Sequence, residues 1–257
     1  GRPGPVLIDI PKDLTDPSVK IEFTYPKKVK IRSYKPIPKE SEDKISTAAK
    51  LLCSAKKPMI YTGGGIILGN AYKELNKLVK SLNYPITNTL MGLGGYPATD
   101  KQFLGMLGMH GTYEANMAMH DCDVLLAVGA RFDDRVTGDT TKFCPSAKII
   151  HIDIDPSSIS KIIEVDLSLV GDTTKILKSL NAAIKPKLKK INKTRLKSWW
   201  SKINKWRAKK CLSYKKSNKI IKPQSVIETL YDVTKGNAFV TSDVGQHQMW
   251  AAQYYKF

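Results

Sequence analysis

The chain has 257 residues and a formal net charge of +19, because 42 Lys and Arg residues outnumber 23 Asp and Glu residues. Hydrophobic residues make up 42% of the sequence, and no uninterrupted apolar stretch is long enough to cross a bilayer, so the composition predicts a globular protein and excludes a membrane-spanning one. The four cysteines lack CxxC spacing, which favours reduced thiols over a zinc site or a disulfide framework.

The first predicted element is a strand over residues 6–10, followed by a turn up to residue 13. Residues 14–39 contain four prolines and alternating basic residues, a composition that favours an extended linker, so we expect a domain boundary there. The chain begins on Gly1 instead of Met, and residues 251–257 have the composition of a helix that continues. We therefore expect both ends to be internal to a longer protein.

Residues 40–184 alternate between predicted helices and strands. The helices are predicted over residues 43–54 and 70–82, and the strands over residues 58–62, 85–88, 123–129 and 147–152, with helical segments between the later strands. This alternation predicts an α/β domain with a parallel sheet that is covered on both faces. The apolar run at residues 124–128 is typical of a central strand.

Residues 185–222 carry much of the excess lysine. A basic stretch is the usual footprint of a nucleic-acid binder, but helix-turn-helix spacing and an aromatic stacking platform are missing, so we interpret the charge as a solvated surface. Trp199, Trp200, Ile203 and Trp206 recur at three- and four-residue spacing, which predicts a basic amphipathic helix. Such a helix packs on its own protein or binds a membrane surface, and the tryptophans favour packing on the protein.

Residues 223–257 form a third predicted unit, with a helix at 226–233 and a strand at 238–242 before the polar segment 243–248.

The segments that could carry chemistry lie mainly in residues 40–184. The first is the run Gly63-Gly64-Gly65, between a strand and a helix. Glycines there let a ligand approach the backbone and a helix N-terminus attracts an anion, but a tight turn explains the run equally well, and the GxGxxG spacing of nicotinamide-binding domains is absent.

Three further segments follow predicted strands or approach helices. His110, in the glycine-flanked segment 107–111, is placed to contact a ligand or to cap a helix. The segment 129–138 packs two arginines and two aspartates directly after the apolar strand, where open parallel sheets bind ligands, and this favours a site over a salt-bridged surface loop. In segment 151–156, Asp153 is placed to meet a ribose or ribityl hydroxyl and Asp155 to cap a helix; residues 171–172 repeat the strand-end pattern.

These segments, together with residues 1–13, 91–94 and 245–250, resemble the large catalytic subunits of the acetolactate synthase family in order and spacing, and among them the bacterial isozyme III type. The resemblance covers essentially the whole chain. Its most specific parts are the motifs RFDDRVTG at 131–138 and GQHQMWAA at 245–252.

The resemblance implies the tail of an N-terminal thiamine pyrimidine-binding domain at 1–13, a linker at 14–39, a central FAD-binding domain at 40–184, a basic helical linker at 185–222 and the start of a C-terminal thiamine diphosphate-binding domain at 223–257. It places Gln246 and His247 on thiamine diphosphate. It also makes Arg135, held by Asp134, the cation that orients the carboxylate of a 2-keto acid. The FAD-binding residues that it implies are Arg2, Gly63, Gly64, Thr89, Leu90, Leu107, Gly108, Met109, His110, Gly129, Ala130, Arg131, Phe132, Asp133, Asp153, Ile154, Gly171 and Asp172.

The activity implied is that of a transferase that condenses two pyruvates, or pyruvate and 2-oxobutanoate, with loss of CO2. The products are 2-acetolactate and 2-aceto-2-hydroxybutanoate, on the route to valine, leucine and isoleucine. The flavin would be largely structural, because the reaction involves no net oxidation. The resemblance further implies a cytoplasmic homodimer with a small regulatory subunit. It puts the activating glutamate and the Mg²⁺ ligands outside this chain, so we expect the chain alone to be inactive. Within enzymes, a pyruvate oxidase or a glyoxylate carboligase is the alternative.

Overall fold

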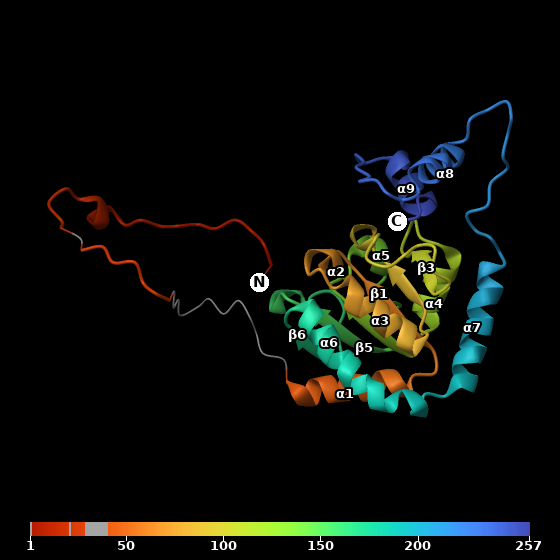
Figure 1. The fold of residues 1–257 in the computed structure, drawn as a ribbon, viewed down its shortest axis with the longest axis horizontal. Coiled ribbons are helices and arrows are strands. Elements are labelled where there is room, and N and C mark those ends of the chain that lie inside the picture. Colours follow the sequence, from red (N-terminus) through yellow and green to blue (C-terminus); the bar gives the residue numbers. More distant parts are fainter. Residues whose placement is uncertain (1, 21, 29–40) are drawn as a thin grey trace.

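The computed structural model describes residues 2–20, 22–28 and 41–257 of the chain (Figure 1). Part of the predicted linker 14–39, and residue 40 of the predicted central domain, therefore lie outside the described residues. The boundaries of the predicted domains stay predictions.

A six-stranded parallel sheet forms the centre of the fold, with the strand order β3-β2-β1-β4-β5-β6. The sheet confirms the predicted α/β class. Its strands are β1 (Pro58–Thr62), β2 (Ile86–Asn88), β3 (Phe103–Met106), β4 (Val124–Val128), β5 (Lys148–Asp153) and β6 (Leu167–Val170).

The two middle strands, β1 and β4, are buried along their whole length. They pair in register from Pro58 with Val124 to Thr62 with Val128. Because both faces of a parallel sheet are covered, such strands need side chains that are apolar on both sides, and the run at 124–128 has this composition. The sequence does not predict β3. This strand is only four residues long, and Gly105, whose φ is +89°, interrupts its run of apolar residues.

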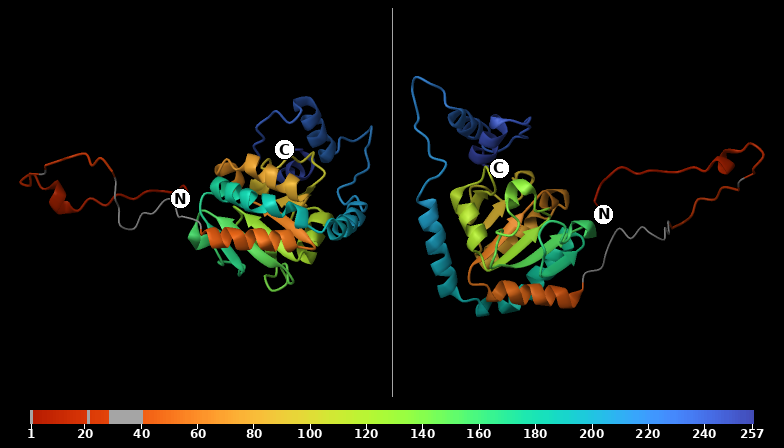
Figure 2. Two further views of the ribbon diagram at one scale, coloured as in Figure 1. Left: turned by 60° about the horizontal axis from the view of Figure 1, so that its bottom comes forward. Right: turned by 180° about the vertical axis from the view of Figure 1, so that it is seen from behind.

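Helices cover both faces of the sheet. α6 (Thr173–Ile184) contacts α1 (Glu42–Ser54) and α3 (Tyr72–Leu82), and these three lie side by side (Figure 2). α4 (Tyr113–Asp121) lies in the connection from β3 to β4. This connection crosses the sheet in the direction opposite to the β1–α3–β2 connection. Since such connections are right-handed, α4 lies on the other face. No helix within the described residues is both long and apolar enough to cross a membrane.

The basic helix α7 (Lys193–Arg207) packs on the body of the protein, as the tryptophan spacing predicts. Trp199 is 2% exposed, and its indole Nε1 donates to the carbonyl oxygen of Pro58 at 2.9 Å, at the start of β1. Leu196 and Ile203 are buried on the same face of the helix. α7 therefore buries its apolar side against α4 and the end of the sheet, while its lysines face solvent.

The remaining helices are short or lie near the C-terminus. They are α2 (Gly65–Leu68), α5 (Asp134–Thr137), α8 (Pro223–Thr234) and α9 (Gln246–Tyr254), and the 3-10 turns are η1 (Lys12–Thr15), η2 (Leu90–Gly92), η3 (Pro156–Ser158) and η4 (Lys185–Lys190).

Four predicted elements are wrong in whole or in part. Residues 6–10 and 238–242 form no strand; Leu7 is 93% exposed and Phe239 fully so. A strand is held by hydrogen bonds to a neighbouring strand, and no described segment pairs with either stretch. The predicted helix at 70–82 begins only at Tyr72, because Asn70 has a φ of +50°. The helical segment predicted at 251–257 ends at Tyr254.

Candidate functional site

The predicted cofactor-binding segments in residues 40–184 all follow strands of the sheet, and they follow different strands. In the order of the sheet, Leu107 comes after β3, Thr89 after β2, Gly63 after β1, Gly129 after β4, Asp153 ends β5 and Gly171 comes after β6. In a parallel sheet the carboxyl ends of all strands lie at one edge. The segments therefore line one continuous edge, which faces α5 and α9 in Figure 1.

This edge has the length and the topology of a site for an elongated ligand. Neighbouring strands lie about 4.8 Å apart, so six strand ends span about 24 Å. The chain moves outward from β1 to β2 and β3, then returns to β4 on the other side of β1. Such a switch point leaves a crevice between the first and fourth strands, where doubly wound sheets bind ligands. Gly63 and Gly129 lie at this crevice.

The glycines at the crevice are needed for the contact between two backbones. A Cβ on Gly63 would lie 2.3 Å from the carbonyl oxygen of Gly129, and a Cβ on Gly65 would lie 2.6 Å from the Cα of Gly129. Gly129 itself has a φ of +58°. The run Gly63-Gly64-Gly65 thus forms the tight turn that was one of its two interpretations. Side chains are excluded at Gly63 and Gly65 because the backbone of this turn touches the backbone at Gly129.

Few backbone donors remain free in this turn. The N–H groups of Gly63, Gly65 and Ile66–Leu68 all donate to carbonyl oxygens of the two loops, at 3.0 to 3.1 Å. Within the described contacts, Gly64 is the residue of this run whose N–H has no acceptor. The helix that follows, α2, is only four residues long. An anion at this point would therefore be bound by the Gly64 N–H and by nearby side chains. The N-terminus of α2 would contribute little, because its N–H groups already have acceptors.

A cavity of about 400 Å³ opens at the crevice, within the size range of small-molecule sites. Predicted site residues make up most of its lining: Gly63, Gly64, Thr89, Leu90, Leu107, Met109, His110, Gly129, Ala130, Arg131, Asp133 and Arg135. The structure adds lining residues that are not among the predicted site residues: Tyr61, Met91, Met106, Val136, Gln248, Met249 and Ala252. The last three belong to α9, so the C-terminal segment forms one wall.

α9 is fixed on this wall by hydrogen bonds to the loops below it. The side-chain amide of Gln253 donates to the carbonyl oxygen of His110 at 2.8 Å, and the backbone N–H of Ala98 donates to the carbonyl oxygen of Phe257 at 2.9 Å. The motif at 245–252 identifies the segment, but its contact with the central sheet depends on tertiary packing alone.

Several predicted site residues do not line the cavity. Asp153 and Gly171 lie further along the edge, where the Gly171 N–H donates to the Asp153 carbonyl oxygen at 2.9 Å. Phe132 has a φ of +55° and its ring is buried among Tyr61, Phe143 and His151, so only its backbone faces the edge. The others outside the cavity are Arg2, Gly108, Ile154, Asp172, Gln246 and His247.

These outlying residues have their own contacts. Arg2 lies near Asp155, whose pKa is lowered mainly by hydrogen bonds from Ser157 and, to a smaller extent, by the Arg2 charge. Asp172 caps α6 by accepting from the Lys175 N–H at 2.9 Å. Gln246 and His247 are exposed at the N-terminus of α9. They are accessible to a ligand there and do not line the cavity.

The loop 107–111 is held rigidly beside the cavity. Asn116 of α4 clamps Gly108 from both sides: its Oδ1 accepts from the Gly108 N–H at 2.8 Å and its Nδ2 donates to the Gly108 carbonyl oxygen at 3.0 Å. The Met109 N–H donates to the Arg135 carbonyl oxygen at 2.9 Å. Gly108 is needed because its φ is +96° and a Cβ would lie 2.6 Å from that same oxygen.

The charged loop 131–135 is ordered by a helix cap. Asp133 accepts from the Arg135 N–H at 3.2 Å and so caps α5. The predicted ion pair between Asp134 and Arg135 does not occur among the described residues. Neighbouring side chains on a helix point in different directions, so Arg135 is positioned through the cap on its backbone. Arg131 and Arg135 both extend, exposed, from the cavity wall.

Two buried polar side chains lie behind the cavity. The hydroxyl of Tyr61, in the wall, has no hydrogen-bond partner among the described residues, and burial raises its pKa. The Nε2 of His151 lies 2.8 Å from the Ala130 carbonyl oxygen, while its Nδ1 has no described partner. Burial lowers the His151 pKa, against the opposing charge of Asp153, which favours the neutral ring. In the described part of the chain, no three His, Cys, Asp or Glu side chains gather as a metal-ligand set.

Comparison with known proteins shows which family the chain resembles. The family described as "Thiamine pyrophosphate enzyme, central domain" matches residues 45–180. Over the whole chain, the sequence is 51% identical to the acetolactate synthase large subunit of Haemophilus influenzae and 49% identical to the acetolactate synthase isozyme 3 large subunit of Escherichia coli strain K12. It is 42% identical to the probable acetolactate synthase large subunit of Methanocaldococcus jannaschii. The chain spans 45% of the length of the first two relatives and 44% of the third.

The contact between the two glycine loops can be tested with Gly129→Ala. Gly138→Ala is a matched control, because both glycines have a φ near +57° but a Cβ on Gly138 meets nothing within 4 Å. We expect Gly138→Ala to lower the free energy of unfolding by about 1–3 kcal/mol through backbone strain alone, because the ψ of −122° at Gly138 lies outside the left-handed helical region. Gly129→Ala adds a clash with the Gly65 backbone, and should cost clearly more in urea titrations followed by circular dichroism. Equal losses would show that the loop contact is not a constraint.

The unpaired hydroxyl of Tyr61 can be tested with Tyr61→Phe. Tyr84→Phe is its control, because the Tyr84 hydroxyl is also buried but donates to the Leu52 carbonyl oxygen at 2.5 Å. Losing a satisfied hydrogen bond lowers the free energy of unfolding by about 1 kcal/mol, whereas removing an unpaired buried hydroxyl costs little or is stabilising. The same urea titrations measure both variants. A loss at Tyr61 as large as that at Tyr84 would mean that the Tyr61 hydroxyl has a partner.

Proposed function

The chain belongs to the family of thiamine pyrophosphate enzymes through its central domain, and on this basis we propose that it is part of an acetolactate synthase large subunit. The proposed reaction condenses two pyruvates, or pyruvate and 2-oxobutanoate, and releases CO2. The single observation that carries this proposal is the identity of about half the residues, along the whole chain, with proteins named as acetolactate synthase large subunits. The sequence motifs, the fold and the cavity are consistent with it.

The carboxyl edge of the sheet fits an extended FAD. The proposed residues follow all six strands in order, as a dinucleotide lying along the edge requires. At the crevice, the free Gly64 N–H and the exposed Arg131 would meet the negative diphosphate, and Leu90 and Leu107 would contact the rings. Asp153 and Gly171, two and three strands from β1, are placed for the adenosine end. When bound, the flavin would serve mainly as a structural element.

Thiamine diphosphate would supply the carbanion chemistry of the reaction when it is bound. In this chain, Gln246 and His247 are exposed at the start of α9, where the free N–H groups of a helix N-terminus favour a diphosphate. α9 also carries Gln248 and Met249 into the flavin cavity. One short helix would thus contact both cofactors. The proposed Mg²⁺ ligands and the activating glutamate lie outside this chain, and the chain by itself is expected to form no acetolactate.

Arg135 is the proposed substrate-orienting residue. Its side chain is exposed at the cavity, while its N–H is held by Asp133 and its carbonyl oxygen by Met109. Because its backbone is held and its guanidinium is exposed, Arg135 is placed to form two parallel hydrogen bonds with a carboxylate.

The similarity to a large subunit of the isozyme 3 type also suggests a separate regulatory subunit. We propose a cytoplasmic homodimer associated with such a subunit.

The spectrum of the purified full-length protein tests the flavin, and anaerobic pyruvate tests its role. We expect the absorption bands of bound flavin, and we expect acetolactate to form while these bands persist, because the condensation involves no net oxidation. Rapid bleaching of the flavin in proportion to pyruvate consumed would identify a pyruvate oxidase instead. A protein purified without flavin that also does not bind added FAD would refute the assignment of the central domain.

Arg135→Gln tests the substrate role, with Arg131→Gln as the matched control in the same loop. Losing a charge-assisted hydrogen bond should raise the KM for pyruvate about ten- to hundredfold, with the flavin spectrum unchanged. Arg131→Gln should instead weaken FAD binding, measured by flavin fluorescence, and leave KM nearly unchanged once FAD is saturating. The assignment of Arg135 fails if the two variants change the same quantity.

A further inference from the structure

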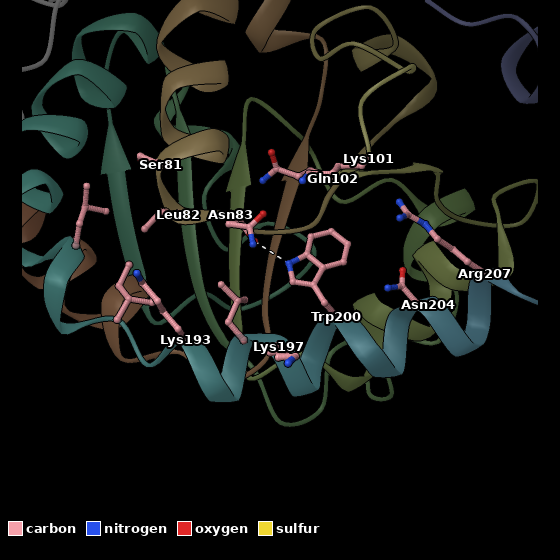
Figure 3. Close-up of a pocket in the computed structure, with 13 residues that line it drawn as sticks. Ser81, Leu82, Asn83, Lys101, Gln102, Lys193, Lys197, Trp200, Asn204 and Arg207 are labelled. Carbon is pink, nitrogen blue, oxygen red and sulfur yellow. Dashed lines mark hydrogen bonds between the residues drawn. The ribbon is translucent and has the colours of Figure 1, made fainter.

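A second concave site lies at the opposite edge of the sheet from the proposed cofactor site. It is a groove of about 520 Å³ between α7 on one side and the C-terminal end of α3 with the loop before β3 on the other (Figure 3). Lys193, Lys197, Trp200, Asn204 and Arg207 line it from α7. Their three- and four-residue spacing puts them on one helix face, along about 21 Å of helix. The residues of the proposed function do not contribute to this groove.

The floor of the groove is apolar. The partly buried Leu188, Ile191 and Trp200 supply its apolar surface, and Leu82 and Leu196, at 1% and 8% exposed, close it underneath. The one buried polar group in the lining, Gln102, already donates to the carbonyl oxygens of Val79 and Tyr84. The floor therefore offers contact area to an aliphatic or aromatic body, and no unpaired polar group of the floor opposes its binding.

Two hydrogen bonds fix the walls of the groove. The indole Nε1 of Trp200 donates to the carbonyl oxygen of Asn83 at 2.8 Å, shown as the dashed line in Figure 3. The guanidinium of Arg207 donates to the carbonyl oxygen of Phe103 at 2.6 Å and lies 5.7 Å from the centre of the Trp200 ring. Because α7 is tied to the C-terminal end of α3 and to β3, a ligand would find the groove already formed, and binding would cost less entropy.

The rim of the groove is cationic. Lys101, Lys193 and Lys197 are exposed there, and none of them is in an ion pair in the described structure. No carboxylate lines the groove. The aspartate next to the rim, Asp100, is already paired with Lys80. Three exposed lysines around an apolar groove without a counter-charge favour a ligand with a negative head group.

We propose that this groove binds a small amphipathic anion, an aliphatic or aromatic body that ends in a carboxylate or a phosphate group. The body would lie on Leu188, Ile191 and Trp200, and the head group would be held by Lys193 and Lys197. The volume of about 520 Å³ is that of a small-molecule site. The proposal does not depend on the proposed function.

Isothermal titration of the full-length protein tests this proposal with four probes below their micelle concentrations. Decanoate and decyl phosphate carry both the chain and the charge, decyltrimethylammonium carries the chain with the opposite charge, and inorganic phosphate carries the charge alone. We expect the first two to bind one per chain, and the cation and inorganic phosphate to bind at least tenfold more weakly. The proposal is wrong if the cation binds as well as the anions, or if neither anion binds.

The double variant Lys193→Glu with Lys197→Glu reverses the charge of the rim, and Lys73→Glu with Lys77→Glu is its control. Both pairs are exposed and four residues apart on a helix, so both change the net charge equally. Lys193 lies in the first turn of α7, where an acidic residue is favourable, and Lys197 is exposed in the next turn. α7 should therefore stay folded, which melting curves check.

The rim variant should lose at least tenfold in affinity for decanoate and decyl phosphate, with the control within twofold of the wild type. Equal losses would indicate a general effect of net charge and would overturn the site, as would an unchanged rim variant. Phosphatidylglycerol vesicles separate a recessed site from a membrane surface: we expect no binding that depends on Lys193 and Lys197, and such binding without binding of the soluble anions would refute the proposal.

Discussion

The close approach of two backbones at the carboxyl ends of β1 and β4 is the constraint on which the rest of the structure depends. The strands pair in register over their whole length, and directly beyond them Gly63, Gly65 and Gly129 touch without side chains between them. The hydrogen bonds from Gly63 to Val128 and from Gly65 to Gly129 continue the pairing past the end of the sheet. A side chain at any of these positions would push the loops apart and change the crevice that they surround.

The same contact determines what the site can offer a ligand. Because most N–H groups of the glycine turn are used between the loops, few backbone donors remain, and recognition falls to side chains that the loops hold in place. Asp133 caps α5 beneath Arg135, and Asn116 clamps Gly108 beneath Met109. The cavity therefore has walls held by hydrogen bonds and exposed cationic side chains at its mouth, an arrangement suited to a ligand that carries phosphate or carboxylate groups.

α7 connects this central domain to the helices α8 and α9, and it shows how one helix combines two surfaces. Trp199 and Ile203 hold it to the protein from its buried face. Trp200 and Arg207 fix its neighbouring face over a groove, and its lysines lie at the rim. The position of α7 also sets where the following residues return to the sheet, so that α9 closes the cofactor cavity with Gln248, Met249 and Ala252. The two concave sites lie at opposite edges of one sheet, and α7 lines only the groove.

By itself, the sequence determined the α/β class, the central strands and the packing of α7, because each rests on a local pattern. The apolar run at 124–128 has the composition of a strand buried on both faces, and the spacing of Trp199 and Ile203 makes an apolar helix face. It also identified most residues of the cavity. Glycines and charges directly after predicted strands must lie at one edge, and the resemblance to the acetolactate synthase family added Thr89 and Leu90. Tertiary structure alone decided that residues 6–10 and 238–242 stay unpaired, that Phe132 is buried, that Tyr61 and α9 complete the cavity, and that Trp200 and Lys197 face a groove. The physical reason is that pairing, burial and concavity depend on which distant segments lie next to each other, and no local spacing records that.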